Sequence, residues 1–347
     1  MTSTTSSAAF GAAGPSGSAG TIEVIDSVEL AVVERSGFIE SRHAGAAVLL
    51  GSDGAVLRAL GDVNAPVFPR SSMKPFQAIA VMASGVVLRG EDAAIATSSH
   101  SGTQKHTDLV RGLLARAGLS EADLGCTPTW PGDSATRDGL VRQGAGPAPI
   151  YSDCSGKHAA MLVACVQNHW PIVGYLDPEH PLQKRILDVV ERFTGERPTA
   201  SGVDGCGAPV HALSLTALAR GIARIATSKS TSPFAIYREA GFLAEAVREN
   251  GWVIAGPGLP DSIAIERLGL FVKGGAEGIM VVSADNGMTV ALKILDGNLR
   301  AATIVALSLL ADAGAVPRSD VDAIIPELKL AVFGGGQPIG QIRASYV

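Results

Sequence analysis

Hydrophobic and polar positions alternate near both ends of the chain in the manner of β-strands. Apolar and β-branched residues fill residues 29–35, 45–50, 55–60, 278–283 and 287–295. Short polar segments, Ser52-Asp53-Gly54 and Ala284-Asp285-Asn286, separate neighbouring runs and predict hairpin turns. Residues 329–333 and 340–347 predict further strands at a sheet edge.

The middle of the chain changes to the 3.6-residue period of amphipathic helices. Apolar positions from Phe76 to Ala83 predict a helix that stops at Gly85. Further helices are expected at residues 104–117, 157–168, 179–194, 208–226 and 298–314, and a loop at 125–153. Strands at both ends with helices between them predict an α/β protein of the α+β type, in which an antiparallel sheet from both chain ends is covered by helices.

Composition and charge narrow the class of protein. The 347 residues carry a net charge of −5, which argues against a nucleic-acid partner. No apolar run reaches the ~18 residues of a membrane-spanning helix, so no membrane partner is expected. Residues 1–20 lack the basic and apolar regions of a signal peptide. We expect a disordered leader at 1–20, a single domain at 21–347 with a helical middle part at about 71–260, and reduced cysteines in a cytoplasmic protein.

Ser71 and Lys74 are the first candidates for catalysis. They have the S-x-x-K spacing of serine acyl-transfer enzymes, in which a neutral lysine accepts the proton of the serine hydroxyl. Positions i and i+3 share a helix face, but Pro75 disfavours helical geometry at Lys74, so the helix is expected to begin near Lys74. A serine cap beside a surface lysine is the alternative explanation.

A second set of hydroxyl and amine groups follows the first. Ser98-Ser99-His100-Ser101-Gly102 is expected on a strand-to-helix loop, where it can relay protons or simply form a polar turn. Lys273-Gly274-Gly275 is similar to the K-T-G motif of the S-x-x-K enzymes, with Gly in place of Thr. The glycines would let a substrate approach the backbone, and Lys273 near Lys74 would lower the pKa of Lys74. A glycine-rich turn with a solvated lysine is the alternative.

Two cysteines lie in separate glycine-rich segments. Cys154 begins the run Cys-Ser-Gly-Lys-His at 154–158, and Cys206 follows Val203-Asp204-Gly205. With Lys157 or His158 they could form a nitrogen and sulfur site of the kind that zinc prefers. Two small buried cysteines without a metal are an equally good explanation of the spacing.

These motifs together resemble a known family. They are Glu40-Ser41-Arg42-His43, Pro69-Arg70-Ser71-Ser72-x-Lys74-Pro75, Ser98 to Gly102, Cys154 to His158, Tyr175-Leu176-Asp177-Pro178, Gly202 to Cys206 and Lys273 to Gly278. Their order over about residues 28–343 resembles the third structural class of bacterial L-asparaginases, the rhizobial-type asparaginase II family. The chain departs from that pattern at Thr103 and at residues 151–153.

The resemblance implies a fold similar to serine β-lactamases and glutaminases, and a homodimer. It implies two Ser–Lys pairs, Ser71 with Lys74 and Ser98 with Lys273, of which Ser71 is the expected nucleophile and Lys74 its base. It also implies one zinc ion on Cys154, Lys157 and Cys206, and a substrate site bordered by Arg70, His158, Asp204 and Gly274.

The activity expected from this resemblance is hydrolysis of the side-chain amide of L-asparagine to L-aspartate and ammonia. A related S-x-x-K amidase or acyl transferase, such as a glutaminase or an esterase, is one alternative. A zinc-binding sensor domain on the same fold is another, since a fold does not dictate a function.

Overall fold

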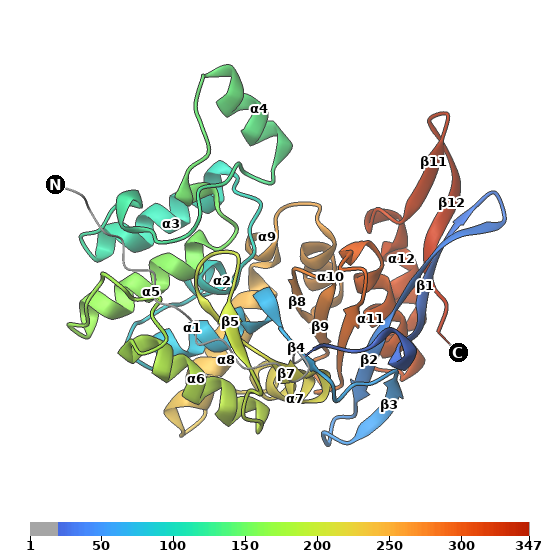
Figure 1. Cartoon of the computed structure of the whole chain (residues 1–347), viewed down its shortest axis with the longest axis horizontal. Helices are drawn as coiled ribbons and strands as arrows, with labels where there is room; N and C mark the ends of the chain where they lie inside the picture. The colour runs from blue at the N-terminus through green and yellow to red at the C-terminus, as the bar shows by residue number, and fades with distance from the viewer. Residues whose placement is uncertain (1–19, 347) are drawn as a thin grey trace, which may run out of the picture.

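The sheet joins the two ends of the chain. The structure, a computed structural model, describes residues 20–346 (Figure 1). Residues 1–19 of the predicted leader therefore lie outside the described residues. An antiparallel sheet of eight strands runs in the order β11-β12-β1-β2-β10-β9-β8, with β3 beside β2. The strands are β1 (Val28–Arg35), β2 (Phe38–Leu50), β3 (Val56–Leu60), β8 (Phe271–Gly275), β9 (Ile279–Ser283), β10 (Thr289–Ile294), β11 (Ala331–Gly334) and β12 (Gln337–Ala344). The predicted sheet from both chain ends is confirmed, as are its two hairpins between β2 and β3 and between β9 and β10.

Helices supply most of the region between the two groups of strands. They are α1 (Lys74–Met82), α2 (Glu91–Thr97), α3 (Gln104–Arg116), α4 (Ser134–Arg142), α5 (Ser155–Gln167), α6 (Pro181–Thr194), α7 (Leu215–Ala226), α8 (Ala235–Glu249), α9 (Gly251–Ile254) and α10 (Pro260–Leu268). Between β10 and β11 lie α11 (Ala302–Asp312) and α12 (Arg318–Ile324). Short pairs of strands, β4 (Pro66–Val67) with β7 (Leu213–Ser214) and β5 (Ser201–Val203) with β6 (Pro209–His211), connect them.

Three local predictions were wrong. The apolar run before Ser98 is the helix α2 and not a strand, because its alanines are buried among helices on every side. The helix expected at 208–226 begins only at Leu215, after β6 and β7, since Ser214 caps it by accepting from the Ala217 amide. The loop expected at 125–153 contains α4, which Asp133 caps and which buries none of its own residues.

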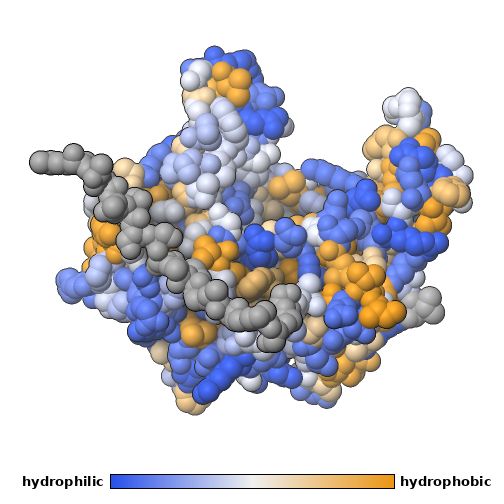
Figure 2. All heavy atoms as spheres, in the orientation of Figure 1, coloured by the Kyte–Doolittle hydropathy of each residue, from blue (hydrophilic) through white to orange (hydrophobic). Residues whose placement is uncertain are grey.

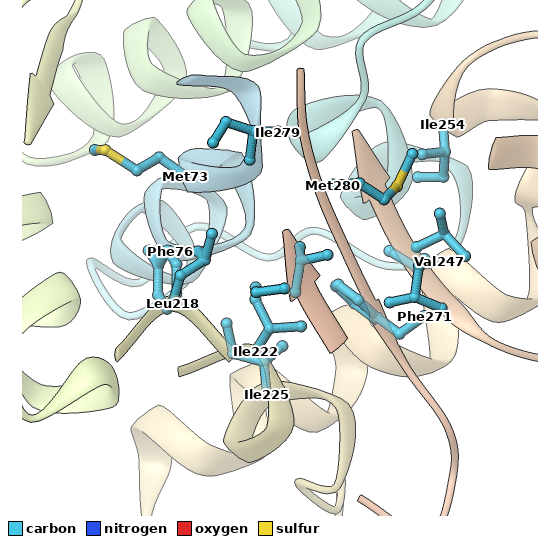
Figure 3. Close-up of a cluster of buried hydrophobic side chains, with 14 of the residues drawn as sticks. Met73, Phe76, Leu218, Ile222, Ile225, Val247, Ile254, Phe271, Ile279 and Met280 are labelled. Carbon is cyan, nitrogen blue, oxygen red and sulfur yellow. The ribbon is translucent and has the colours of Figure 1, made fainter. Parts of the chain in front are cut away.

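Helices cover both faces of the sheet around its most buried strands. Every residue of β8, β9 and β10 is buried. The helices α7 and α11 both pack on β9 and β10, from opposite faces (Figure 1). Apolar side chains of α1, α7, α8, β8 and β9 meet in the core drawn in Figure 3, among them Phe76, Ile222 and Phe271. The core therefore holds the start of α1 against the end of β8.

The molecule carries two projections. In Figure 1 α4 extends from the helical part and the β11–β12 hairpin extends from the sheet, and Figure 2 shows a hollow between them. The outer part of the α4 projection is mainly hydrophilic in Figure 2. Within residues 20–346, the helices are all too short or too polar to cross a bilayer.

Candidate active site

The start of α1 places Ser71 and Lys74. A 3-10 turn over Arg70–Met73 leads into α1, which begins at Lys74 with Pro75 in its first turn, as the sequence predicted. Arg70 has a φ of 50°, which is rare for a residue with a side chain. A Cβ on Gly275 would lie 2.7 Å from the Pro69 carbonyl oxygen, so only glycine lets β8 approach this turn.

The loop at residues 98–102 is fixed to the segment that precedes α10. The Ser99 amide donates to the Ile254 carbonyl at 2.8 Å, and the Ser101 amide donates to the Ala255 carbonyl at 2.7 Å. Gly256 adopts a φ of 146°, and a Cβ there would lie 2.3 Å from the Ser101 hydroxyl oxygen. These backbone contacts hold Ser99 beside Lys74.

Two buried lysines share the Ser99 hydroxyl. Lys74 Nζ lies 2.9 Å from Ser99 Oγ, and Lys273 Nζ lies 2.8 Å from the same atom. Lys74 also donates to the Ser98 and Asp153 carbonyl oxygens, at 2.7 and 3.1 Å, and lies 3.5 Å from the Asp153 carboxylate. Lys273 makes one further bond, to the Gly274 carbonyl at 2.8 Å. Lys74 is therefore surrounded by acceptors, whereas Lys273 has few.

The two lysines titrate in opposite directions. Burial and then the charge of Lys74 lower the pKa of Lys273 to about 7. Burial also acts to lower the pKa of Lys74, but the charge of Asp153, together with the neighbouring Cys154 and Cys206 thiols, raises that pKa above its usual value. The sequence predicted a depressed pKa at Lys74, and this was wrong. The depressed lysine is Lys273, so the base available near neutral pH is on β8.

The serine beside the lysines is Ser99 and not Ser98. The Ser98 hydroxyl donates to the Ile95 carbonyl at 3.0 Å in the last turn of α2, and its side chain is buried. The expected pairing of Ser98 with Lys273 is thus replaced by Ser99 with both lysines. Ser71 makes no side-chain hydrogen bond to Lys74 in the described part of the chain, since the bonds of Lys74 Nζ go to residues 98, 99 and 153.

A cavity of about 370 Å³ opens beside these groups. Its polar lining includes Ser71, Ser99, Asp153, Asp261 and Thr303, and its apolar lining includes Ala255, Leu259, Pro260, Met280 and Leu299. Elements from both halves of the fold contribute, because β8, α10 and the start of α11 come from the end of the chain and Ser71 and Ser99 from its first third. The cavity brings both candidate hydroxyls to one space of the size that small ligands occupy.

Gly274 lines this cavity but its amide is already engaged. It donates to Asp261 Oδ2 at 2.8 Å, and a Cβ on Gly274 would lie 2.9 Å from that oxygen. The glycine pair of the Lys-Gly-Gly motif thus makes room for parts of the protein itself. An added side chain would meet Asp261 at Gly274 and the turn before α1 at Gly275, but both glycines line the cavity, so the approach of a substrate to this backbone stays a prediction.

Three of the expected substrate residues do not line the cavity. Arg70 donates to Asp204 at 2.7 Å, and this ion pair lies on the side of the thiols. His158 is fully buried, with its Nδ1 2.6 Å from the Tyr175 hydroxyl. The structure therefore gathers Arg70, Asp204 and His158 into a second polar region.

That second region is built around Cys154, Lys157 and Cys206. All three side chains are at least nine-tenths buried, with exposures of 5%, 2% and 5%. The neighbouring Cys154 thiol, and then the charge of Lys157, hold the pKa of Cys206 far below that of an ordinary thiol. A close approach of Gly156 to the Ile95 carbonyl, where a Cβ would lie 2.2 Å away, brings α5 against α2 and hence these groups beside Lys74.

The donor set of this region fits a thiophilic metal ion. His158 Nε2 is buried without a hydrogen-bond partner among residues 20–346, next to Cys206. No group of three or more His, Cys, Asp or Glu side chains within the described chain has the arrangement of a metal site. A metal at this place would have two sulfurs, Cys154 and Cys206, and a nitrogen of Lys157 or His158 beside it, and such a set suits zinc.

Three functional residues escaped the sequence analysis. Ser99 stood beside the serine that was chosen, and only the geometry of the loop distinguishes the two. Asp153 and Asp261 had no motif of their own, although Asp153 directly precedes Cys154 and Asp261 opens α10. A carboxylate that neutralises a buried lysine is required physically, but its position in the sequence cannot be calculated from that requirement.

Comparison with known proteins agrees with the motifs. The model of the L-asparaginase II family matches residues 31–344. No curated protein matches the chain.

Similar solved structures include two described as Mglu, one of them in its glutamate form. The glutamate form is 13% identical to this protein, with a TM-score of 0.44, and the match covers 78% of this chain and 61% of the Mglu chain. The second has 12% identity and a TM-score of 0.42 over 78% of this chain and 67% of that one. A β-lactamase from Mycobacterium bovis has 15% identity and a TM-score of 0.37 over 82% of this chain and 95% of that one. Because the family model spans nearly all of the described residues, the chain belongs to the L-asparaginase II family.

Proposed function

We propose that the protein hydrolyses the side-chain amide of L-asparagine to L-aspartate and ammonia. The observation that carries this proposal is the Ser99 hydroxyl shared by two buried lysines on the wall of a cavity that also holds the Ser71 hydroxyl. Membership of the L-asparaginase II family supports an amide substrate, and the size of the cavity supports a small one.

In the proposed reaction Ser71 Oγ attacks the amide carbon. Ser71 lines the cavity, and its hydroxyl has no fixed partner among residues 20–346, so it is free to turn toward a substrate. Its proton passes to Ser99 and from there to Lys273, whose depressed pKa leaves the amine neutral part of the time near pH 7. Lys273 then returns the proton to the amide nitrogen, the C–N bond breaks and ammonia leaves. A water molecule, which gives its proton to the same lysine, hydrolyses the ester on Ser71 and releases L-aspartate. The amides of Ser71 and Ala276 donate to no backbone oxygen in the described part of the chain and are available to the oxygen that becomes negative.

Lys74 has a different task in this scheme. Asp153 keeps it protonated, so it supplies a fixed positive charge next to Ser99 rather than a base. That charge stabilises the serine oxygen while the proton is in transit and lowers the pKa of Lys273. The carboxylate of Asp153 offsets the ammonium charge of Lys74, which allows the Lys74 side chain to be fully buried beside the more exposed Asp153.

The same geometry supports a second assignment of the nucleophile. Ser99 is the hydroxyl in direct contact with the neutral lysine, so it could attack while Ser71 donates to the leaving ammonia. Mass spectrometry of the trapped acyl-enzyme distinguishes the two, because the added mass is on the peptide that contains Ser71 in one case and Ser99 in the other.

We propose further that one zinc ion binds Cys154, Lys157 and Cys206, with water as the remaining ligand. When bound, the metal would act as a template that holds the end of the substrate or shapes the site. The Arg70–Asp204 pair and His158 lie beside these ligands and would orient them, as outer partners of metal ligands commonly do. The family resemblance also leads us to propose a homodimer located in the cytoplasm, which light scattering and cell fractionation test.

The proposed function is tested by ammonia release from L-asparagine and L-glutamine and by cleavage of a chromogenic ester. We expect asparagine to have the highest kcat/KM, and Ser71→Ala to lower kcat by at least about a thousandfold without loss of the fold. Preference for glutamine or the ester would replace asparaginase by a related amidase or esterase. Binding of asparagine without turnover would support a sensor domain.

A further inference from the structure

The cavity contains one carboxylate that forms no ion pair within residues 20–346, although its charge acts on the nearby Lys273. Of its two acidic side chains, Asp153 lies 3.5 Å from Lys74 and is matched by it. Asp261 forms no ion pair with any lysine, arginine or histidine among residues 20–346, and its one hydrogen bond comes from the Gly274 amide at 2.8 Å. The Asp261 side chain is partly buried, and a carboxylate that is partly removed from water and has no ion pair favours a cation as its partner.

The position of Asp261 is fixed in advance. Its Oδ2 is held by the Gly274 amide, so the carboxylate points into the space between α10 and β8, and Oδ1 has no partner in the described part of the chain. Any side chain at position 274 would collide with it, because a Cβ there would lie 2.9 Å from Oδ2. A carboxylate held in this way binds a cation without first losing conformational freedom.

Asp261 also lies among apolar neighbours. Leu259, Pro260 and Met280 line the same wall, so part of the surface around the carboxylate is apolar. A charge-assisted hydrogen bond in such a place is stronger than one at the surface. A cation bound here would lie in the same cavity as Ser71 and Ser99, within the reach of a small amino acid.

We propose that Asp261 binds the α-ammonium group of the substrate and makes the site selective for amides that carry one. This inference rests on the proposed function, since it names the group by which that site recognises its substrate. Amides of the same length without an α-amino group would leave the carboxylate unpaired in an apolar wall and would be rejected for that reason.

A purely structural role is the competing explanation, because Asp261 also clamps β8 next to Lys273. Asp261→Asn separates the two roles: an asparagine side chain can still accept from the Gly274 amide, but it has no negative charge. Asp261→Glu serves as the second variant, since it keeps the charge and moves it by one methylene group.

The experiment compares L-asparagine with succinamate, which has the same amide and carboxylate but no α-amino group. We expect Asp261→Asn to lower kcat/KM for asparagine at least about tenfold more than for succinamate, as the loss of a charged hydrogen bond predicts. Asp322→Asn, which removes an exposed carboxylate on α12, is the control and should leave the ratio at its wild-type value. Equal losses with both substrates would assign Asp261 to structure alone and overturn the proposal.

A binding measurement keeps this test separate from the test of the proposed function. Calorimetry with L-aspartate and with succinate reports the same recognition without turnover. We expect the wild-type protein to bind aspartate at least about tenfold more tightly than succinate, and Asp261→Asn to lose that preference. If the protein hydrolyses no amide but keeps this preference, the asparaginase proposal fails and the role of Asp261 stands; equal affinity for both ligands in the wild type would refute the role of Asp261.

Discussion

The start of α1 and the end of β8 each bury one lysine completely, yet the two lysines behave in opposite ways. Lys74 has Asp153 and two carbonyl oxygens around its amine, and its pKa is raised. Lys273 has a hydroxyl and one carbonyl oxygen, and its pKa falls to about 7. Burial is the same in both cases, so the difference comes from the nearby negative groups: Asp153 and the two thiols act strongly on Lys74, whereas the charge of Lys74 acts against a proton on Lys273.

This difference explains why a single serine can be shared by two amines. Two ammonium groups beside one hydroxyl would repel each other. The fold avoids this because Lys74 stays protonated next to Asp153, while Lys273 loses its proton near neutral pH. Lys273 then accepts a proton near neutral pH and Ser99 connects it to the cavity. The following predictions test this division of tasks.

The largest effect is expected where the two lysines meet. Ser99→Ala should lower kcat at least about a hundredfold, because it removes the hydroxyl that both lysines contact. Ser98→Ala is the matched control: its hydroxyl bonds only to the Ile95 carbonyl, so kcat should change less than about threefold. Steady-state assays of the two variants check this, and a larger loss at Ser98 would contradict the geometry.

The second prediction concerns pH. The base must be neutral to act, so kcat/KM should rise as pH increases through about 7, the pKa of Lys273. Below that value the rate should fall about tenfold per pH unit. A pH–rate profile of the wild-type protein measures this. A profile that is flat from pH 5 to 9, or one with a midpoint near 10, would show that Lys273 is not the base.

The third prediction concerns the thiols that lie behind Lys74. Cys206→Ser should lose bound zinc and raise KM about tenfold with a smaller change in kcat, as expected for a metal that positions the substrate. Cys165→Ser, in the apolar part of α5, is the control and should keep its metal. Metal analysis of the purified proteins decides. Equal zinc in both would exclude Cys206 as a ligand, and a metal-free wild type with full activity would exclude a functional role.

The last prediction concerns stability. Lys273 titrates near 7 in the folded protein and near 10.5 when unfolded, so the unfolded state binds more protons between these values and stability rises with pH there. Lys273→Met removes this penalty and should raise the free energy of unfolding below pH 7 by at most about 5 kcal/mol, with the gain vanishing above about pH 10.5. Denaturant titrations at pH 6 and pH 9 measure the difference. A variant that is less stable than the wild type at pH 6 would show that protonated Lys273 does not destabilise the folded protein.

Much of the fold could be predicted from local pattern. The strands of the sheet, both hairpins and the helix α3 follow from period and turn residues, and the start of α1 followed from Pro75 alone. The helix α4 could not be recognised because it buries no residue, so no apolar stripe marks it. The helix α2 was taken for a strand because an alanine-rich segment buried on all sides has no periodicity to read.

The site was predicted less completely, and for a different reason. Motifs show which residues carry chemistry, but not how a loop orients neighbouring side chains, and so Ser98 was chosen in place of Ser99. The direction of a pKa shift depends on residues distant in sequence: Asp153 is 79 positions from Lys74 and reverses its titration. Spacing along the chain contains no information about such a pair.

The pairing of β1 with β12 has a consequence for biosynthesis. Ala31 lies opposite Ala344. The second edge of β1 is therefore covered only after β12, more than three hundred residues later, has been synthesised. Likewise β2 meets β10 only after more than two hundred residues have left the ribosome, as the pairing of Leu50 with Thr289 shows. Contacts this distant form slowly and leave strand edges unpaired in the meantime. A nascent chain of this protein therefore exposes the β1–β2–β3 meander through most of its synthesis, and chaperones that bind apolar strands should find it there.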